Sequence, residues 1–91
     1  MANFTESQAK ACTILNLTKT KVGDDVSWRA KVKDSNGSIY NIHNVSSKDD
    51  PDSAEIKSGV LKWLLERPVK EVASVSEEEL ETGKGINETI G

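Results

Sequence analysis

The chain has 91 residues, a formal net charge of −3 and an apolar fraction of 35%, which suits one modest core and is too short for two domains. No stretch approaches the about 20 apolar residues of a membrane span, and no basic run followed by an apolar one opens the sequence as in a secretory signal. The single cysteine, Cys12, excludes an internal disulfide and is typical of a reducing compartment, so we expect a soluble, cytoplasmic protein with no membrane partner.

A short helix and a hairpin are the first elements that the pattern predicts. Thr5 and Gln8 have the spacing of a capping box, which favours a helix start at this point. Residues 13–22 are rich in β-branched side chains, and residues 26–33 alternate between apolar and polar ones, as in a half-buried strand. Residues 23–25, with the sequence Gly-Asp-Asp, are the turn expected between the two strands.

A third strand is expected at residues 38–45, where four apolar or aromatic side chains lie within eight positions. The preceding Asn36-Gly37 pair tolerates positive φ and indicates a tight turn. Together with the hairpin, this strand predicts a three-stranded antiparallel meander.

The main helix is predicted over residues 51–66. Asp50 can cap a helix and Pro51 suits its first position, and apolar residues recur at helical spacing through the segment. Gly59 interrupts this pattern, and either close backbone packing or simple tolerance explains it. Pro68 lacks an amide donor and disfavours helical geometry at the residue before it, so the helix should end there.

The C-terminal part is expected to be less regular. Residues 69–75 have the pattern of a short fourth strand, and Ser76 with Glu79 has capping-box spacing for a brief helix that ends at Gly83. Residues 84–91 contain only two apolar side chains, so we expect a flexible tail whose removal leaves the stability of the protein nearly unchanged.

These elements predict one α+β domain over residues 1–83. The expected architecture is a small mixed four-stranded sheet, which consists of the antiparallel meander and the fourth strand. One main amphipathic helix covers one face of this sheet, and short helices lie near the termini. A β-helix-β crossover is nearly always right-handed, so the fourth strand should return parallel beside the first, in the order 3-2-1-4. The double-stranded RNA-binding domain shares this order of elements, but residues 49–52 put acids where that domain has basic side chains. We therefore assign no family.

Catalytic and metal-binding patterns are missing from the sequence. Cys12 and His43 are the only residues of their types, so no zinc site of Cys and His ligands is available, and a nucleophilic pair requires these two to meet. No glycine-rich phosphate loop occurs. Three acids at residues 49–52 lack the later ligands of a calcium loop, and helix capping explains them. We predict that the chain is not an enzyme and holds no metal or cofactor.

The charge is distributed unevenly. Residues 1–48 contain seven Lys or Arg and four acids, a net of +3, whereas residues 49–91 contain five and eleven, a net of −6. If Val22 pairs with Val26 across the hairpin, Trp28 lies on the core face and five cations share the opposite face. This candidate binding face consists of Lys19, Lys21, Arg29, Lys31 and Lys33. It can contact phosphates, or it can be the ordinary polar face that a sheet turns to water.

An acidic run near the C-terminus is the second candidate surface. It consists of Glu77, Glu78, Glu79 and Glu81. Successive acids at a helix start are usually solvated and complement the helix dipole. The alternative is an acidic docking patch for a partner.

The sequence favours a non-catalytic protein-interaction module: a small accessory, regulatory or inhibitor protein of bacterial or phage type that docks on another protein. The second hypothesis is nucleic-acid binding through the basic face, which the acidic total and the lack of exposed aromatics among the cations oppose. The third is a structural subunit of a larger assembly. The sequence does not separate the first from the third, and it leaves the partner and the oligomeric state open.

Overall fold

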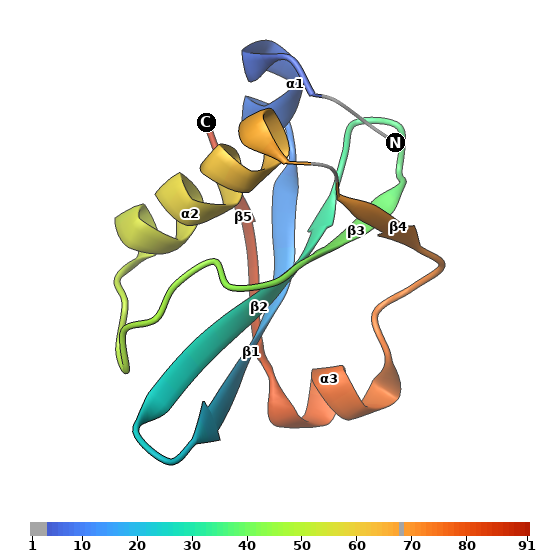
Figure 1. The fold of residues 1–91 in the computed structure, drawn as a ribbon. Coiled ribbons are helices and arrows are strands. Elements are labelled where there is room, and N and C mark those ends of the chain that lie inside the picture. Colours follow the sequence, from blue (N-terminus) through green and yellow to red (C-terminus); the bar gives the residue numbers. More distant parts are fainter. Residues whose placement is uncertain (1–3, 68) are drawn as a thin grey trace.

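The computed structural model describes residues 4–67 and 69–91, which form a five-stranded antiparallel sheet with three helices (Figure 1). The helices are α1 (Glu6–Lys10), α2 (Ser53–Glu66) and α3 (Glu77–Thr82). The strands are β1 (Thr13–Val22), β2 (Asp25–Lys33), β3 (Ile39–Ile42), β4 (Lys70–Val72) and β5 (Lys84–Thr89). The small α+β class predicted from the sequence is confirmed, although the described sheet has five strands where four were expected.

Side chains next to the helix starts cap them. Thr5 Oγ1 accepts a hydrogen bond from the Gln8 amide at 3.2 Å, and the Thr5 amide donates to Gln8 Oε1 at 3.0 Å. These two bonds complete the predicted capping box of α1. Asp52 caps α2 by accepting from the Glu55 amide at 2.8 Å, so this helix begins slightly later than expected.

Helix α2 packs very closely against the segment that follows β3. A Cβ atom at Gly59 would overlap the backbone carbonyl of Val45, so close packing, and not tolerance, explains the glycine inside this helix. The helix ends at Glu66, as predicted from Pro68, a residue that lies outside the described part of the chain.

The strand order is β4-β3-β2-β1-β5. Strand β4 pairs antiparallel with β3, so the predicted order 3-2-1-4 with a parallel return is wrong. The path of the chain gives the reason: the loop after β3 crosses the sheet before α2 begins, and α2 carries the chain back toward the edge it left (Figure 1). The right-handed crossover rule concerns parallel neighbours, and all pairs among the described strands are antiparallel.

The free side of β1 is occupied by β5, in the segment that was expected to be a tail. Strand β5 pairs antiparallel with β1, and beyond it the Ile90 amide donates to the Cys12 carbonyl at 3.0 Å. Ile86 and Ile90 both pack against the core. The sequence pattern missed this strand because two apolar residues in eight give no alternation to recognise.

Strands β1 and β2 pair one residue out of the expected register. Val22 lies opposite Asp25 and not Val26, because the loop has two residues. Gly23 has a φ of +61°, the positive value that a type II′ turn needs at its first central position. A shift of one residue moves the side chains of one strand to the other face of the sheet. Trp28 stays on the core face, as predicted, but the cations of β1 change sides.

A bulge in β1 keeps two large residues in the core. The register shifts between Ile14 and Asn16, and one extra residue in a strand reverses its alternation. Ile14 and Leu17 therefore both point inward and are only 1% and 4% exposed. Asn16 lies on the opposite face, where it is also buried.

The core lies between the sheet and the helices α1 and α2. Its buried apolar side chains are Ala9, Cys12, Ile14, Leu17, Ala30, Val32, Tyr40, Ile42, Val45, Ile56, Val60, Leu64 and Val69. Trp28 and Trp63 both pack against this core and remain partly exposed. The indole nitrogen of each donates a hydrogen bond to a backbone carbonyl of the loop between β3 and α2.

Candidate functional site

The predicted basic face is divided between the two faces of the sheet. Paired residues of neighbouring strands share a face, so Lys19 lies with Trp28, and Lys21 lies with Val26, on the side of α2. The other three cations, Arg29, Lys31 and Lys33, lie on the opposite side. The structure therefore does not bring the five residues together, because the expected register was shifted by one residue.

Lys19 holds the loop between β3 and α2. Its ammonium group lies 2.5 Å from Asp49 Oδ1 and 5.9 Å from the centre of the Trp28 ring. The hydrogen bond and the charge of Lys19 lower the pKa of the Asp49 carboxyl. The Trp28 indole donates to the Lys48 carbonyl at 2.8 Å. The charge of Lys19 is therefore already paired inside the chain.

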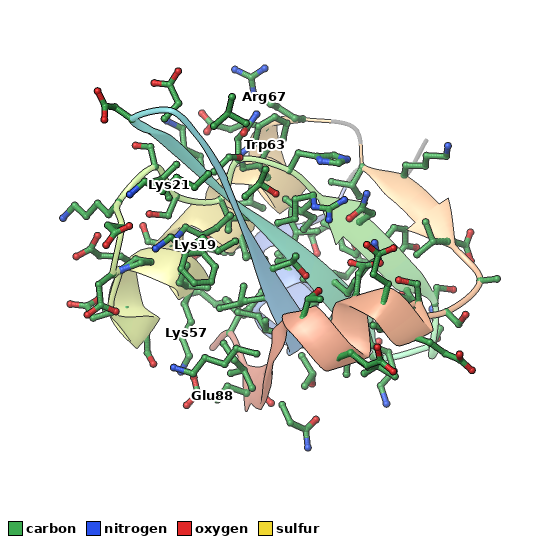
Figure 2. The ribbon with its side chains drawn as sticks, turned by 90° about the horizontal axis from the view of Figure 1, so that it is seen from below. Lys19, Lys21, Lys57, Trp63, Arg67 and Glu88 are labelled. Carbon is green, nitrogen blue, oxygen red and sulfur yellow. The ribbon has the colours of Figure 1, made fainter. Side chains whose placement is uncertain are left out.

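Trp63 holds the other end of the same loop. Its indole nitrogen donates to the Asn44 carbonyl at 3.3 Å, and the Arg67 guanidinium lies 4.7 Å from the ring centre. Figure 2 shows these two side chains next to each other. Each tryptophan thus combines a contact to the core, a hydrogen bond to the loop and a neighbouring cation.

The acidic run lies on α3, but its members face different ways. Glu79 points inward and pairs with Lys31, with 3.1 Å between Glu79 Oε1 and Lys31 Nζ. The other three acids, Glu77, Glu78 and Glu81, are exposed. Leu80 lies among them and is 63% exposed. The predicted acidic patch therefore keeps three of its four residues at the surface.

Glu79 and Lys31 belong to a polar cluster between α3 and the sheet, which we define as Asn16, Arg29, Lys31, Asn41 and Glu79. Asn16 Nδ2 donates to the Glu79 carbonyl at 2.7 Å, and Lys31 Nζ donates to Asn41 Oδ1 at 2.9 Å. Burial alone raises the pKa of Glu79, but hydrogen bonds from Lys31 and Ser76 outweigh it and the pKa is lowered. Asn16 Oδ1 and Arg29 Nε are buried without a hydrogen-bond partner among the described residues.

A small pocket opens between β5 and the N-terminal end of α2, with a volume of about 60 Å³. Leu17, Trp28, Ile56 and Ile86 supply apolar walls, and Asp50 and Lys84 are among its polar lining residues. We call this site the Trp28 pocket. Sequence reasoning missed it because Lys84 and Ile86 were assigned to a tail, and only the pairing of β5 with β1 brings them beside Trp28.

An ion pair between α2 and β5 lies on the same side of the sheet as this pocket. Lys57 Nζ is 3.8 Å from Glu88 Oε2, and both side chains are partly exposed. Figure 2 shows the two side chains reaching toward each other. This contact links the last strand to helix α2.

The lone cysteine and histidine have ordinary surroundings. The Cys12 thiol donates to the Gln8 carbonyl at 3.4 Å, and burial, with a contribution from Asp34, raises its pKa to about 11. His43 Nε2 shares a hydrogen bond with Asn41 Nδ2 at 2.9 Å. In residues 4–67 and 69–91, no three His, Cys, Asp or Glu side chains are grouped as metal ligands, and no helix is long and apolar enough to cross a membrane.

Comparisons with known proteins found no matching family model, no similar curated protein and no similar solved structure. The function must therefore be inferred from the surfaces described above.

Proposed function

We propose that this chain is a non-catalytic protein-interaction module of the cytoplasm, an accessory, regulatory or inhibitor protein of bacterial or phage type, and that it docks through the Trp28 pocket. The observation that carries the proposal is a partly exposed tryptophan that lines a small pocket with both apolar and charged side chains. Tryptophan is enriched among the few residues that dominate binding energy in protein interfaces.

The size of the pocket favours a protein partner over a small molecule. Sites for small molecules usually enclose about 300–1,000 Å³, whereas this pocket has about 60 Å³. Such a volume accepts one side chain of a partner and leaves the rest of that partner on the surrounding surface. Asp50 and Lys84, at the same pocket, provide polar groups that can orient it.

The nucleic-acid hypothesis has less support from the arrangement of the cations. It depended on five cations on one face, but they lie on two faces. Lys19 and Lys31 are moreover paired with acids of the same chain. The hypothesis of a structural subunit differs from our proposal only in the permanence of the partner, and it uses the same pocket.

Selection of short random peptides from a phage-displayed library tests the proposal. Ser53 lines the pocket and is exposed, so Ser53→Tyr should cover it with little effect on the fold. Ser58→Tyr, at an exposed position of the same helix rotated by about 140°, is the matched control. We expect selected peptides to lose about tenfold in affinity for S53Y, as for the loss of one buried anchor, and to bind S58Y unchanged.

Two results contradict the proposal. One is a selection that enriches no peptide over an unrelated small domain. The other is a set of peptides that bind S53Y and S58Y equally well while both variants keep the melting temperature of the wild type.

A further inference from the structure

Among the described residues, helix α3 makes its hydrogen bonds and its ion pair to the sheet through one residue, Glu79. No residue of α3 is buried; the carboxylate of Glu79 pairs with Lys31, and its backbone carbonyl accepts a hydrogen bond from Asn16. Helices of globular proteins usually bury an apolar stripe. Helix α3 therefore contacts the sheet as a polar ligand contacts a binding site, through a charged group and without a buried apolar face.

The sheet face beneath α3 is cationic. Because paired residues share a face, four cations lie on this side of the sheet. They are Arg29, Lys31, Lys33 and Lys70. Helix α3 brings four acids to the same side, but only Glu79 forms an ion pair with these cations among the described residues. The cationic face is therefore only partly neutralised by the chain itself.

The site that Glu79 occupies contains a buried hydrogen-bond donor that Glu79 does not use. Arg29 Nε is buried and has no hydrogen-bond partner within residues 4–67 and 69–91, although buried donors in native proteins almost always have one. A guanidinium group binds a carboxylate best through two parallel hydrogen bonds, and Nε is one of the available donors. The single carboxylate of Glu79 is occupied by Lys31 and Ser76 and leaves this donor free.

We propose that the sheet face beneath α3 is a carboxylate-binding site, built on Arg29 and Lys31, in which Glu79 is the resident occupant and which an acidic segment of a protein partner enters by displacing α3. This site is separate from the Trp28 pocket, since it lies on the opposite face of the sheet. It does not depend on the function proposed for that pocket.

Two features favour a carboxylate over a phosphate group. The residue already bound there is a carboxylate, at 3.1 Å from Lys31 Nζ. Asn16 Oδ1 is also buried, next to Gly83 at the end of α3, and has no hydrogen-bond partner in the part of the chain that the structure describes. An acceptor at this place opposes the higher negative charge of a phosphate. An acidic helix or loop of a protein provides the charge that fits.

The covalent attachment of α3 to the rest of the chain, which we call the tether, explains why the site is closed in the isolated chain. A segment attached at both ends competes at an effective concentration on the order of millimolar, so α3 excludes weak ligands from solution. Removing the carboxylate of Glu79 takes away this competition and leaves Arg29 and Lys31 in place.

The test uses a fluorescent peptide with the sequence of residues 74–83 and measures its binding by anisotropy. We expect Glu79→Gln to bind this peptide at least about tenfold more tightly than the wild type, with an affinity that falls as salt is added. Glu77→Gln, which changes an exposed acid of the same helix, is the matched control and should behave as the wild type. A peptide with Gln at the position of Glu79 should bind E79Q more weakly.

Hydrogen exchange supplies an independent measurement. In E79Q the amides of Leu80 and Gly83, which are bonded within the α3 segment, should exchange faster while those of β1 and β2 keep their rates. If E79Q fails to fold, the same exchange in the wild type with millimolar peptide decides the question, since displacement of α3 must accelerate these two amides.

Three results would overturn the proposal. The first is folded E79Q that binds the peptide no better than the wild type. The second is α3 exchange that the peptide leaves unchanged in the wild type at a concentration above the effective concentration of the tether. The third is a single-stranded DNA oligonucleotide that binds E79Q more tightly than the peptide does, which would assign the site to nucleic acid.

Discussion

Glu79 of α3 and Lys31 of β2 form an ion pair with 3.1 Å between oxygen and nitrogen, and their side chains are only 13% and 7% exposed. In the sequence these residues belong to two separate candidate surfaces, one acidic and one basic. The fold makes them partners, so part of the charge that the two surfaces offered to other molecules is used inside the chain.

The first prediction concerns the dependence of stability on pH. Hydrogen bonds from Lys31 and Ser76 keep the pKa of Glu79 below its ordinary value of 4.5, against the opposing effect of burial. A carboxyl group with a lowered folded-state pKa stabilises the fold above its unfolded pKa, and this stabilisation is lost as the pH falls through the folded pKa. Glu79→Gln should therefore lower the free energy of unfolding at pH 7 by about 1–3 kcal/mol, and the difference from the wild type should shrink below pH 4.5.

Urea denaturation at several pH values measures this difference. Glu77→Gln removes an exposed acid from the same helix and should change stability by no more than about 0.5 kcal/mol. A difference between the wild type and E79Q that grows as the pH falls has the wrong sign and contradicts the assignment.

The second prediction concerns Gly59. Alanine is a better helix former than glycine by about 1 kcal/mol, but its Cβ atom would overlap the carbonyl of Val45. We expect Gly59→Ala to destabilise the protein by about 1–3 kcal/mol, the usual cost of overpacking. The neighbouring exposed residue provides the control, because Ser58→Ala should leave stability unchanged or slightly raised. A higher melting temperature for G59A than for the wild type would show that the helix does not approach Val45 this closely.

The third prediction concerns the C-terminal strand. The sequence pattern led us to expect that residues 84–91 contribute little, but β5 pairs with β1 and brings Ile86 and Ile90 to the core. Removal of these residues should lower the melting temperature by at least about 10 °C, because each kcal/mol corresponds to about 4–8 °C for a domain of this size. Differential scanning calorimetry measures the change. If the shortened chain melts with the full-length protein, the contribution of β5 is negligible.

The fourth prediction separates the two groups of cations. Single-stranded DNA titrated against the wild type at low and moderate salt should show no binding that weakens steeply with salt. If such binding is found, Lys19→Gln with Lys21→Gln should test one face and Arg29→Gln with Lys33→Gln the other. Each affected pair should flatten the slope of log affinity against log salt by about two. Salt-dependent binding that either double variant weakens would contradict the prediction and revive the nucleic-acid hypothesis for that face of the sheet.

The fifth prediction concerns Cys12. Burial, together with Asp34, raises the pKa of its thiol to about 11, so about one molecule in a thousand carries the reactive thiolate at pH 8. A disulfide reagent should therefore modify the native protein far more slowly than the protein in urea. Reaction at similar rates in both conditions would show that the thiol is accessible and contradict its place in the core.

The sequence by itself determined the elements that depend on neighbouring residues. Thr5, Asp52 and Ser76 cap the three described helices through bonds to amides three residues away, and two of these capping signals were read correctly while the third was placed within two residues. The Asn36-Gly37 turn and the meander followed from equally local patterns, with Gly37 at a φ of +90°. Such interactions are decided within one turn of the chain, so the pattern of residues contains them.

The tertiary structure alone decided the register of β1 and β2, the place of β4 and the existence of β5. The two-residue loop between β1 and β2 decides on which face of the sheet the cations of β1 lie, and the bulge near Asn16 reverses the alternation at the start of β1. No local sequence pattern distinguished the two-residue loop from the expected three-residue loop or indicated the bulge. The bond from Asn16 to Glu79 joins residues 63 positions apart. Which distant segments pack together depends on which arrangement of the whole chain buries all the apolar faces at once. This arrangement pairs Glu79 with Lys31 and brings Lys84 to the same pocket as Trp28.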